Sequence, residues 1–345
     1  MKKPYMIAEM GVNFYDTAKA LGISPLEAAK MYIDAAAKVG IDCAKFQSYK
    51  AGTIVSKNSP AYWDTTKEPT KTQYELFLKH DSFGEKEYKE LCEYTHAKGM
   101  DFTSTPFDYV SADYLEEMVD FYKISSSDLS NLPFVRYIGR KGKPVYISVG
   151  AAYLSEVDEA VRALNEEGCK DIVLMHCVLS YPTDPENANL RVIETLKNVF
   201  PSARIGFSDH VAPDSTMMTL ATAYLLGAEV IEKHFTLDKR LQGNDHYHSG
   251  DPDDFAKAIS NFRWIDTVLG CSKKEVLECE IIPRREARRS LVLTRDMKEG
   301  EIITEKDVMA KRPGTGISPK YTEIVIGRTI KKNLKEDTVL TWDMV

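Results

Sequence analysis

The sequence lacks the features that mark membrane, secreted and nucleic-acid-binding proteins. Its 345 residues contain no run of the roughly 18 apolar residues that a membrane-spanning helix needs. The first residues carry two lysines but no long apolar stretch, so no signal peptide is expected. The six cysteines show no CxxC or zinc-type spacing, and 45 Lys and Arg are outnumbered by 52 Asp and Glu. We therefore expect a cytoplasmic protein with free thiols that binds neither membranes nor nucleic acids.

What remains is an ordinary globular composition. Hydrophobic residues make up 43% of the chain and charged residues 28%, so the chain can bury a large core and is not mainly disordered. The length fits one large domain or two unequal ones.

The first 270 residues alternate between β-rich runs and helical patterns. The helix expected over 25–39 follows Ser24, a capping residue, and has a proline at its first position. The expected strands cover 5–11, 43–49, 101–107, 121–128, 144–150, 172–178, 204–210 and 230–237. Eight strand–helix units over about 250 residues predict an α/β protein with a (β/α)8 TIM barrel. A doubly wound sheet is the main alternative, but eight regular units favour closure.

Two segments depart from this alternation. Residues 50–72 form a long insertion after the second strand, which is either a lid or substrate-contacting loop or a solvated surface loop. After the barrel (1–270) we expect a linker (271–283) and a small β-rich domain (284–345). From residue 281 onward, 14 Lys and Arg face 10 Asp and Glu, so a tail of net charge +4 follows an acidic barrel. The arginines at its start are more typical of a solvated helix face or linker than of a ligand site.

Polar side chains gather toward the C-terminal ends of the expected strands, where the active site of a barrel lies. A lysine buried in a strand is costly unless it meets a partner or an anion, so Lys45 and Lys123 predict an anionic substrate inside the barrel. Hydroxyl groups beside them suit phosphate or carboxylate oxygens. The strand-end residues are Glu9, Lys45, Gln47, Thr103, Thr105, Lys123, Ser126, Asp128, Ser148, Ser180, Tyr181, Ser208, His210, Glu232 and His234.

Two histidines end neighbouring strands and form a candidate metal pair. His210 and His234 would leave coordination positions open for water and substrate, which suits a Lewis-acid role. Asp209 and Glu232 are either partners of these histidines or structural residues. The His-x-His pattern at 246–248 follows the eighth strand and is a candidate for substrate contact or metal binding.

Several motifs together resemble the sialic acid synthase family. They follow the family's order and span nearly the whole chain: IAEMGVN (7–13), AKFQSY (44–49), STPFD (104–108), YKISSSDLSNLP (122–133), SVG (148–150), HCVLSYPT (176–183), GFSDH (206–210) and EKHFT (232–236). The tail motifs RRSLVLTRDMKEGEIITEKDV (288–308) and KRPGTGISP (311–319) resemble the family's C-terminal antifreeze-like (SAF) domain. The resemblance implies a barrel enzyme that condenses phosphoenolpyruvate with an N-acetylated amino-sugar aldehyde. Phosphate is released, and the product is a nonulosonic acid such as N-acetylneuraminate, legionaminate or pseudaminate.

The resemblance also implies roles for individual residues. His210 and His234 would bind a divalent ion, manganese or magnesium. For this reaction Glu9 is either the acid/base or hydroxyl-orienting carboxylate or a structural residue. The catalytic set is then Glu9, Lys45, Lys123, His210 and His234. Phosphoenolpyruvate would contact Lys45, Thr105, Lys123, Ser126, Ser148 and Ser208, and the sugar would contact Glu9, Gln47, Tyr181 and Asp245. The family forms a domain-swapped homodimer, in which the residue matching Arg312 reaches the N-acetyl end of the sugar in the other subunit's active site.

The chain departs from the bacterial N-acetylneuraminate synthases at a few positions. Leu179 replaces an asparagine, Asp128 replaces a glutamate in the substrate-binding motif, residues 11–16 lose a histidine, and residues 242–245 replace PGPD. These changes leave the histidine pair and the two lysines intact, so they concern the sugar more than the reaction. Two alternatives stay open: another phosphoenolpyruvate–aldose synthase that uses a phosphorylated sugar, and a non-catalytic sugar-binding protein.

Overall fold

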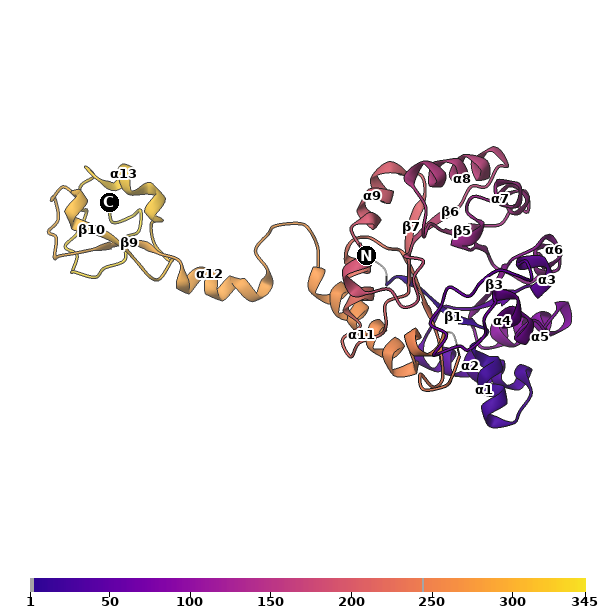
Figure 1. The fold of residues 1–345 in the computed structure, drawn as a ribbon. Helices are drawn as coiled ribbons and strands as arrows, with labels where there is room; N and C mark the ends of the chain where they lie inside the picture. Colours follow the sequence, from indigo (N-terminus) through magenta and orange to yellow (C-terminus); the bar gives the residue numbers. More distant parts are fainter. Residues whose placement is uncertain (1–2, 244) are drawn as a thin grey trace. The chain divides into compact units, whose positions relative to one another are not determined.

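The computed structural model describes residues 3–243 and 245–345 (Figure 1). The chain divides into two compact units, the first ending at Gly270 and the second covering Cys271–Val345. Within the described residues, none of the helices combines the length and the apolar character needed to span a bilayer.

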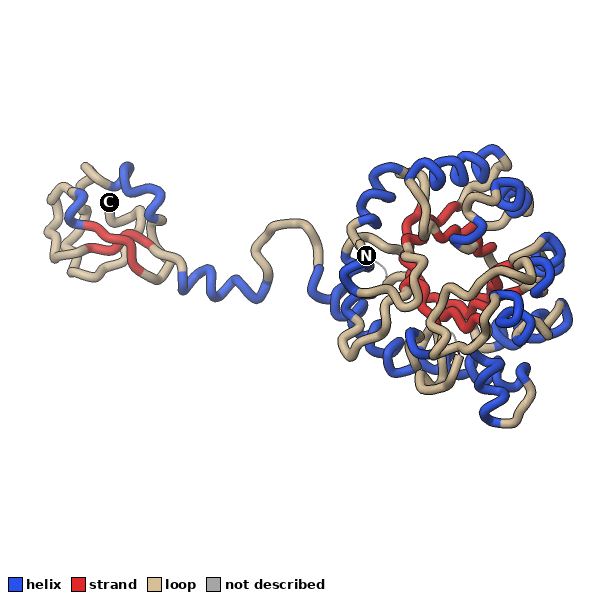
Figure 2. The backbone as a smooth tube through the Cα atoms, in the orientation of Figure 1, coloured by secondary structure: helices blue, strands red, loops and turns tan. Residues whose placement is uncertain are grey.

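Eight parallel strands form the inner ring of the first unit, with the helices outside them (Figure 2). The strands are β1 (Tyr5–Gly11), β2 (Cys43–Ser48), β3 (Asp101–Pro106), β4 (Tyr122–Ile124), β5 (Val145–Ser148), β6 (Ile172–His176), β7 (Arg204–Asp209) and β8 (Val230–His234). Their order in the sheet is β3-β2-β1-β8-β7-β6-β5-β4. The ends of this sheet meet where the Thr103 hydroxyl donates to the Phe121 carbonyl at 2.6 Å and Asp120 N donates to Phe102 O at 3.0 Å. The predicted TIM barrel is confirmed.

Helices cover the outside of the barrel, and each of the eight expected helices is present. They are α2 (Pro25–Val39), α5 (Glu85–Ala97), α6 (Tyr109–Leu115), α7 (Leu132–Gly139), α8 (Leu154–Glu166), α9 (Val192–Val199), α10 (Met218–Leu225) and α11 (Pro252–Leu269). The start of α2 follows from its sequence: the Ser24 hydroxyl accepts from Glu27 N, and the Glu27 carboxylate accepts from Ser24 N. It ends at Gly40, whose φ of 83° favours glycine. In the described residues of the first unit, the structure adds three helices without a counterpart in the sequence pattern: α1 (Asn13–Leu21), α3 (Ala51–Ile54) and α4 (Gln73–Lys79).

The interior of the barrel changes character along its axis. At the N-terminal end the inward side chains pack into an apolar cluster, which contains Ile7, Cys43, Phe121, Tyr146, Val173, Met175 and Val230. Two residues further along five of these strands, the same face carries Glu9, Lys45, Lys123, Ser148 and Glu232. The apolar cluster therefore forms a floor, and the polar residues stand above it toward the C-terminal ends of the strands.

The second unit is a small β-containing domain preceded by α12 (Ile281–Ala287). Its antiparallel pair joins β9 (Ser290–Leu293) to β10 (Val308–Lys311), and a short helix, α13 (Thr322–Val325), follows. A 3-10 turn covers Glu305–Asp307. The apolar core of the second unit includes Leu291, Leu293, Met297, Ile303, Ile317, Val325 and Leu340.

Candidate active site

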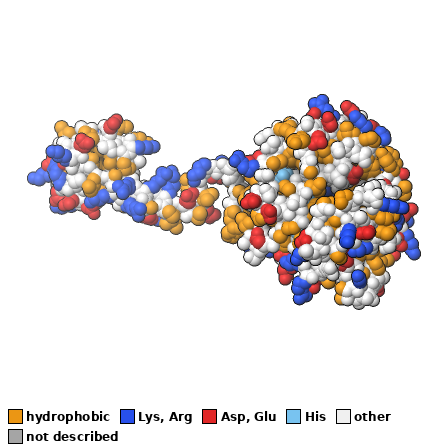
Figure 3. All heavy atoms as spheres, viewed as in Figure 1, with side chains coloured by type: hydrophobic (Ala, Val, Ile, Leu, Met, Phe, Trp, Pro, Cys, Tyr) orange, Lys and Arg blue, Asp and Glu red, His pale blue; other side chains and the backbone are white. Residues whose placement is uncertain are grey.

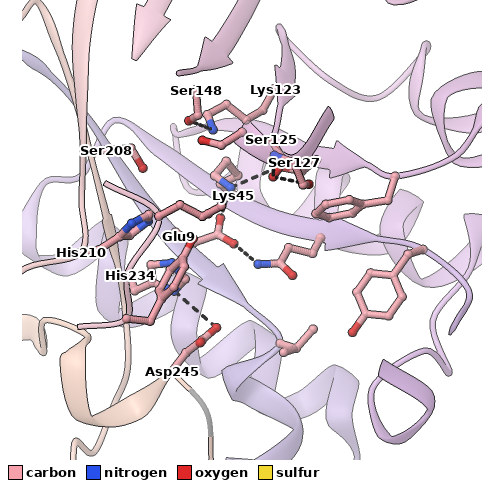
Figure 4. Close-up of a pocket in the computed structure, with 18 of the residues that line it drawn as sticks. Glu9, Lys45, Lys123, Ser125, Ser127, Ser148, Ser208, His210, His234 and Asp245 are labelled. Carbon is pink, nitrogen blue, oxygen red and sulfur yellow. Dashed lines mark hydrogen bonds and ion pairs between the residues drawn. The ribbon is translucent and has the colours of Figure 1, made fainter. Parts of the chain in front are cut away.

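A cavity of about 390 Å³ lies at the C-terminal ends of the barrel strands (Figure 4). Apart from Asp128, the barrel residues predicted to bind substrate or metal all line it: Glu9, Lys45, Gln47, Thr105, Lys123, Ser126, Ser148, Tyr181, Ser208, His210, His234 and Asp245. Two of the other strand-end residues, Thr103 and Ser180, do not line it. Asp128 lies outside this lining, in the turn after β4, where its carboxylate accepts from the Asn131 amide at 3.3 Å. Arg312 belongs to the second unit, directly after β10. The binding roles of all these residues stay predictions.

Two lysines and two glutamates form a buried charge cluster at the base of the cavity. The Lys45 ammonium pairs with Glu9, and it lies 3.6 Å from Glu232 Oε1. The Lys123 ammonium lies 3.7 Å from the same Glu232 oxygen. All four residues are less than 5% exposed, so these charges interact in a medium that screens them weakly. Glu232 thus bridges the two lysines, a role that its place on the strand did not reveal.

Hydroxyl groups surround this cluster. Lys123 donates to Ser148 Oγ at 2.6 Å, and Lys45 donates to Thr105 Oγ1 at 3.2 Å. Ser208 donates to Glu232 at 3.1 Å. Because a hydroxyl hydrogen rotates freely, each of these groups can turn to bind an anionic oxygen beside the lysines.

The protonation states of the cluster favour a bound anion. Burial raises the pKa of Glu9 to about 7, and the charge of Glu232 adds to this effect, although Lys45 opposes it. Burial also opposes the ionisation of Glu232, but Lys123 and Lys45 hold its pKa below the ordinary value. The two lysines therefore face one carboxylate that stays ionised and one whose protonated form is favoured by burial. An incoming anion would complete the balance of charge.

The histidine pair lies at the side of this cluster, on β8 and just after β7. His210 Nδ1 donates to the Val178 carbonyl at 2.6 Å, which leaves the lone pair on Nε2. His234 Nδ1 is buried without a hydrogen-bond partner in the described residues and lies 3.5 Å from Asp245 Oδ2. The two rings are 5.5 Å apart, and the Tyr181 ring lies 4.1 Å from that of His210. Burial lowers the pKa of His210 to about 4 and that of His234 well below the usual range, so both rings are neutral.

This donor set fits a divalent metal ion. Neutral imidazoles with free lone pairs are ordinary ligands of such ions, and the Asp245 carboxylate beside His234 Nδ1 favours the tautomer that leaves the lone pair on His234 Nε2. In the described parts of the chain, no cluster of three or more His, Cys, Asp or Glu side chains has the geometry of a metal site. An ion on His210 and His234 would therefore take its other ligands from water and substrate.

The loop after β8 packs behind the histidine pair. His246 is fully buried, with Nδ1 2.7 Å from Thr236 Oγ1 and Nε2 3.5 Å from Asp16 Oδ2. His248 is also fully buried, and its Nε2 lies 3.4 Å from Asp245 Oδ1. Neither His246 nor His248 lines the cavity, so each can affect a bound substrate only through a neighbouring residue. Asn244, which belongs to the altered 242–245 motif, lies outside the described residues.

The insertion after β2 is a folded outer wall of the cavity. Pro60 and Thr72 pair as an antiparallel bridge, and Lys79 forms an ion pair with the buried carboxylate of Glu68 at 2.7 Å. The insertion supplies Ile54 and Tyr62 to the lining of the cavity, and α4, which follows it, supplies Gln73, Leu76 and Phe77. Of the two interpretations that the sequence left open, the structure therefore places this segment at the site.

Sequence reasoning missed several residues of the lining. Ser125, Ser127, Cys177 and Leu179 follow β4 and β6, and Tyr49 follows β2. Their positions just after a strand are a signal that could have included them. The residues of the insertion carried no such signal, because loop packing does not follow strand or helix periodicity.

Comparison with known proteins decides the family. Residues 32–274 match the NeuB family, and residues 288–345 match the SAF domain. The chain belongs to the NeuB family. The expected membership of the sialic acid synthases and the expected SAF domain are thereby confirmed.

Relatives of this NeuB-family chain cover almost its whole length. The N,N'-diacetyllegionaminic acid synthase of Campylobacter jejuni is 36% identical over 99% of both chains. The N-acetylneuraminate-9-phosphate synthase of Homo sapiens is 30% identical over 99% of this chain and 92% of that protein. The crystal structure of N-acetylneuraminic acid (sialic acid) synthetase from Leptospira borgpetersenii, in complex with citrate, superposes with a TM-score of 0.69. Its sequence identity is 32%, and the match covers 82% of this chain and 90% of that one.

Proposed function

We propose that this NeuB-family enzyme condenses phosphoenolpyruvate with the open-chain aldehyde of an N-acylated amino sugar. The methylene carbon of phosphoenolpyruvate bonds to the aldehyde carbon, water adds at the adjacent carbon, and phosphate leaves. The observation that supports this most strongly is the buried pair of lysines, framed by hydroxyl groups, beside two neutral histidines in one cavity (Figure 4).

The lysines and hydroxyl groups would bind phosphoenolpyruvate. Its carboxylate and phosphate provide anionic oxygens for Lys45 and Lys123, which share the single Glu232 carboxylate when Glu9 is protonated. Ser148 and Thr105 already touch these lysines, so they are placed to complete the binding of the same oxygens. Fixing both ends of a small, rigid ligand orients its methylene carbon, and alignment of this kind supplies a large part of the rate of a bimolecular reaction.

His210 and His234 would hold a divalent ion, manganese or magnesium. When bound, such an ion supplies Lewis-acid activation of the sugar's aldehyde oxygen. The histidines themselves are positioned by the chain: the Val178 carbonyl fixes the ring of His210, and Asp245 lies beside His234.

Glu9 would exchange protons with the reactants. A carboxyl group with a pKa of about 7 is present in both protonation states at neutral pH, which suits general acid–base work. The Gln47 amide donates to Glu9 Oε1 at 2.7 Å and fixes its orientation. The sugar would then lie between Glu9, Tyr181 and Asp245.

The SAF domain would act in a domain-swapped homodimer, in which Arg312 contacts the sugar in the partner subunit's cavity. The net charge of +4 from residue 281 onward, against an acidic barrel, supports docking of this kind.

Phosphate release tests the reaction. Purified protein is incubated with phosphoenolpyruvate and one sugar of a panel, with manganese or with a chelator. The panel holds N-acetylmannosamine, its 6-phosphate, arabinose 5-phosphate and the 2,4-diacetamido-2,4,6-trideoxyhexoses. Release that requires an N-acylated sugar and stops on chelation is the expected result. Release with arabinose 5-phosphate alone would favour the other aldose synthases, and no release with any sugar would refute the proposed reaction.

A further inference from the structure

The cavity has two chemically different ends. The inner end carries both lysines and the charge cluster on the strands. The outer end is formed by Tyr49 directly after β2, by Phe107 directly after β3, and by Leu76 and Phe77 of α4. The Tyr49 ring packs edge-on against Phe77 at 5.2 Å and against Phe107 at 6.0 Å. The outer end is therefore an aromatic and aliphatic wall built around Tyr49.

One polar atom in this wall has no partner. The Tyr49 side chain is 4% exposed, and within the described residues its hydroxyl makes no hydrogen bond. Leaving such a group unpaired costs on the order of 1–3 kcal/mol, so a buried hydroxyl of this kind is usually paired by a ligand or water. Burial raises the pKa of Tyr49 well above its ordinary value, with smaller contributions from Tyr15, Asp81 and Asp245. The hydroxyl is therefore a neutral hydrogen-bond donor at every working pH.

Within the part of the chain that the structure describes, the barrel itself offers no cation to an anionic ligand at the outer end. Among the described residues that line the cavity, Lys45 and Lys123 are the only lysines, none is an arginine, and both lysines belong to the inner end. Two lysines that flank this wall are engaged elsewhere: Lys50 donates to the carbonyls of Asp81 and Phe83, and Lys79 pairs with Glu68. A phosphate group at this end would be desolvated without a counter-ion from the barrel that forms the cavity.

Two carboxylates of the lining also disfavour a phosphate group relative to an uncharged group. Asp16 and Asp245 both line the cavity, and both side chains are largely buried. Although burial opposes it, hydrogen bonds from His246 and His80 hold the pKa of Asp16 at about 2. A dianionic phosphate would therefore meet negative charge here. An uncharged group that combines a hydrogen-bond acceptor with a methyl group would meet a donor and an apolar surface.

We propose that Tyr49, with Leu76, Phe77 and Phe107, forms a subsite for an uncharged acylamino group at the end of the sugar remote from its aldehyde. This inference rests on the proposed function, because that function places the aldehyde at the inner end. The acyl carbonyl accepts a hydrogen bond from Tyr49, and the acyl methyl group packs against the three apolar side chains. The preferred acceptor is then a diacetamido-trideoxyhexose rather than N-acetylmannosamine or its 6-phosphate.

The Tyr49→Phe variant of the full-length protein tests this assignment, with Tyr74→Phe as the matched control. Tyr74 lies on the same helix as Phe77 but does not line the cavity. For wild-type protein we expect the highest kcat/KM with 2,4-diacetamido-2,4,6-trideoxymannose. Tyr49→Phe should lower that value about tenfold, the size expected when a buried acceptor loses its donor. The same variant should change kcat/KM for N-acetylmannosamine less than about threefold and leave the KM for phosphoenolpyruvate unchanged. Tyr74→Phe should change none of these values.

Direct binding separates this inference from the reaction. Calorimetric titration of the diacetamido sugar does not require turnover, and Tyr49→Phe should weaken its binding about tenfold. Loss of affinity without any phosphate release would support the subsite while refuting the reaction. The subsite would be overturned, even when phosphate is released, if Tyr49→Phe lowered kcat/KM equally for the diacetamido sugar and for N-acetylmannosamine. A preference of the wild-type protein for the 6-phosphate would overturn it as well.

Discussion

Removing the charge of Glu232 tests the charge cluster at the base of the cavity. Glu232→Gln keeps the shape of the side chain and its contact with Ser208, but leaves Lys45 and Lys123 without the carboxylate that bridges them. At 3.6 Å and 3.7 Å, each attraction is about 4.5 kcal/mol with an effective dielectric constant near 20. Removing one partner of a buried ion pair typically costs about 3–5 kcal/mol of the free energy of unfolding.

Glu9 should recover part of this loss. The charge of Glu232 is one cause of the raised pKa of Glu9, so its removal favours ionisation of Glu9 beside Lys45. We therefore expect a net loss of about 2–3 kcal/mol at pH 7.5, below the full value for an uncompensated pair. Phosphoenolpyruvate would replace the missing anion, so it should stabilise the variant more than the wild type.

Urea denaturation with and without phosphoenolpyruvate measures both effects. Glu229→Gln is the matched control, because Glu229 is exposed immediately before β8 and its substitution should change stability by less than about 0.5 kcal/mol. A loss below about 1 kcal/mol for Glu232→Gln, or weaker stabilisation of the variant than of the wild type by phosphoenolpyruvate, would refute the electrostatic argument.

Three further predictions concern the metal pair, the dimer and the SAF domain. His210→Ala should abolish manganese binding, measured by electron paramagnetic resonance, with an unchanged circular dichroism spectrum; full binding would exclude this residue as a ligand. If Arg312 acts across the dimer, refolding a mixture of the His210→Ala and Arg312→Ala variants should restore about a quarter of wild-type activity. Half of the dimers would then be mixed, and each mixed dimer would have one intact site of two. No recovery of activity would contradict the domain swap. A hydrogen bond from Thr304, and then the ion pair with Arg295, lower the pKa of Asp307 to about 2. The resulting stabilisation, on the order of 1–2 kcal/mol, is present above the ordinary aspartate pKa and is lost as the pH falls toward 2. Asp307→Asn should therefore destabilise the SAF domain more at pH 7 than at pH 3, and hydrogen exchange showing equal effects at both values would disprove this linkage.

The barrel was predictable because its signals are local. Alternating β-rich runs and helical patterns mark the strands and helices, and the two-residue period of a strand shows which side chains share its inner face. Glu9 and Lys45 follow Ile7 and Cys43 on that face, so the two-residue period alone predicts the charged layer above the apolar floor. Strand ends then bring these residues together in any closed barrel.

Other parts of the site depend on packing between distant segments. Glu232 precedes His234 by two residues, which indicates a shared face, but only the closed barrel shows that it bridges lysines from two other strands. The burial of His246 and His248 behind the cavity follows from their contacts with Asp16 and Asp245, which no local pattern encodes. The folding of the insertion likewise rests on contacts within a loop without periodicity.

Part of the outer wall of the cavity lies on short helices that are separate from the strands of the barrel. Ile54 and Phe77 are only partly buried and lie on the short helices α3 and α4, outside the ladder of strands that holds Lys45, Lys123 and His234. Substitutions at such positions change little of the barrel's folding free energy, whereas changes on the strands disturb a packed interior. On the proposed assignment, a few substitutions in this wall would change the acceptor sugar, while the strand residues proposed to carry the reaction would stay in place.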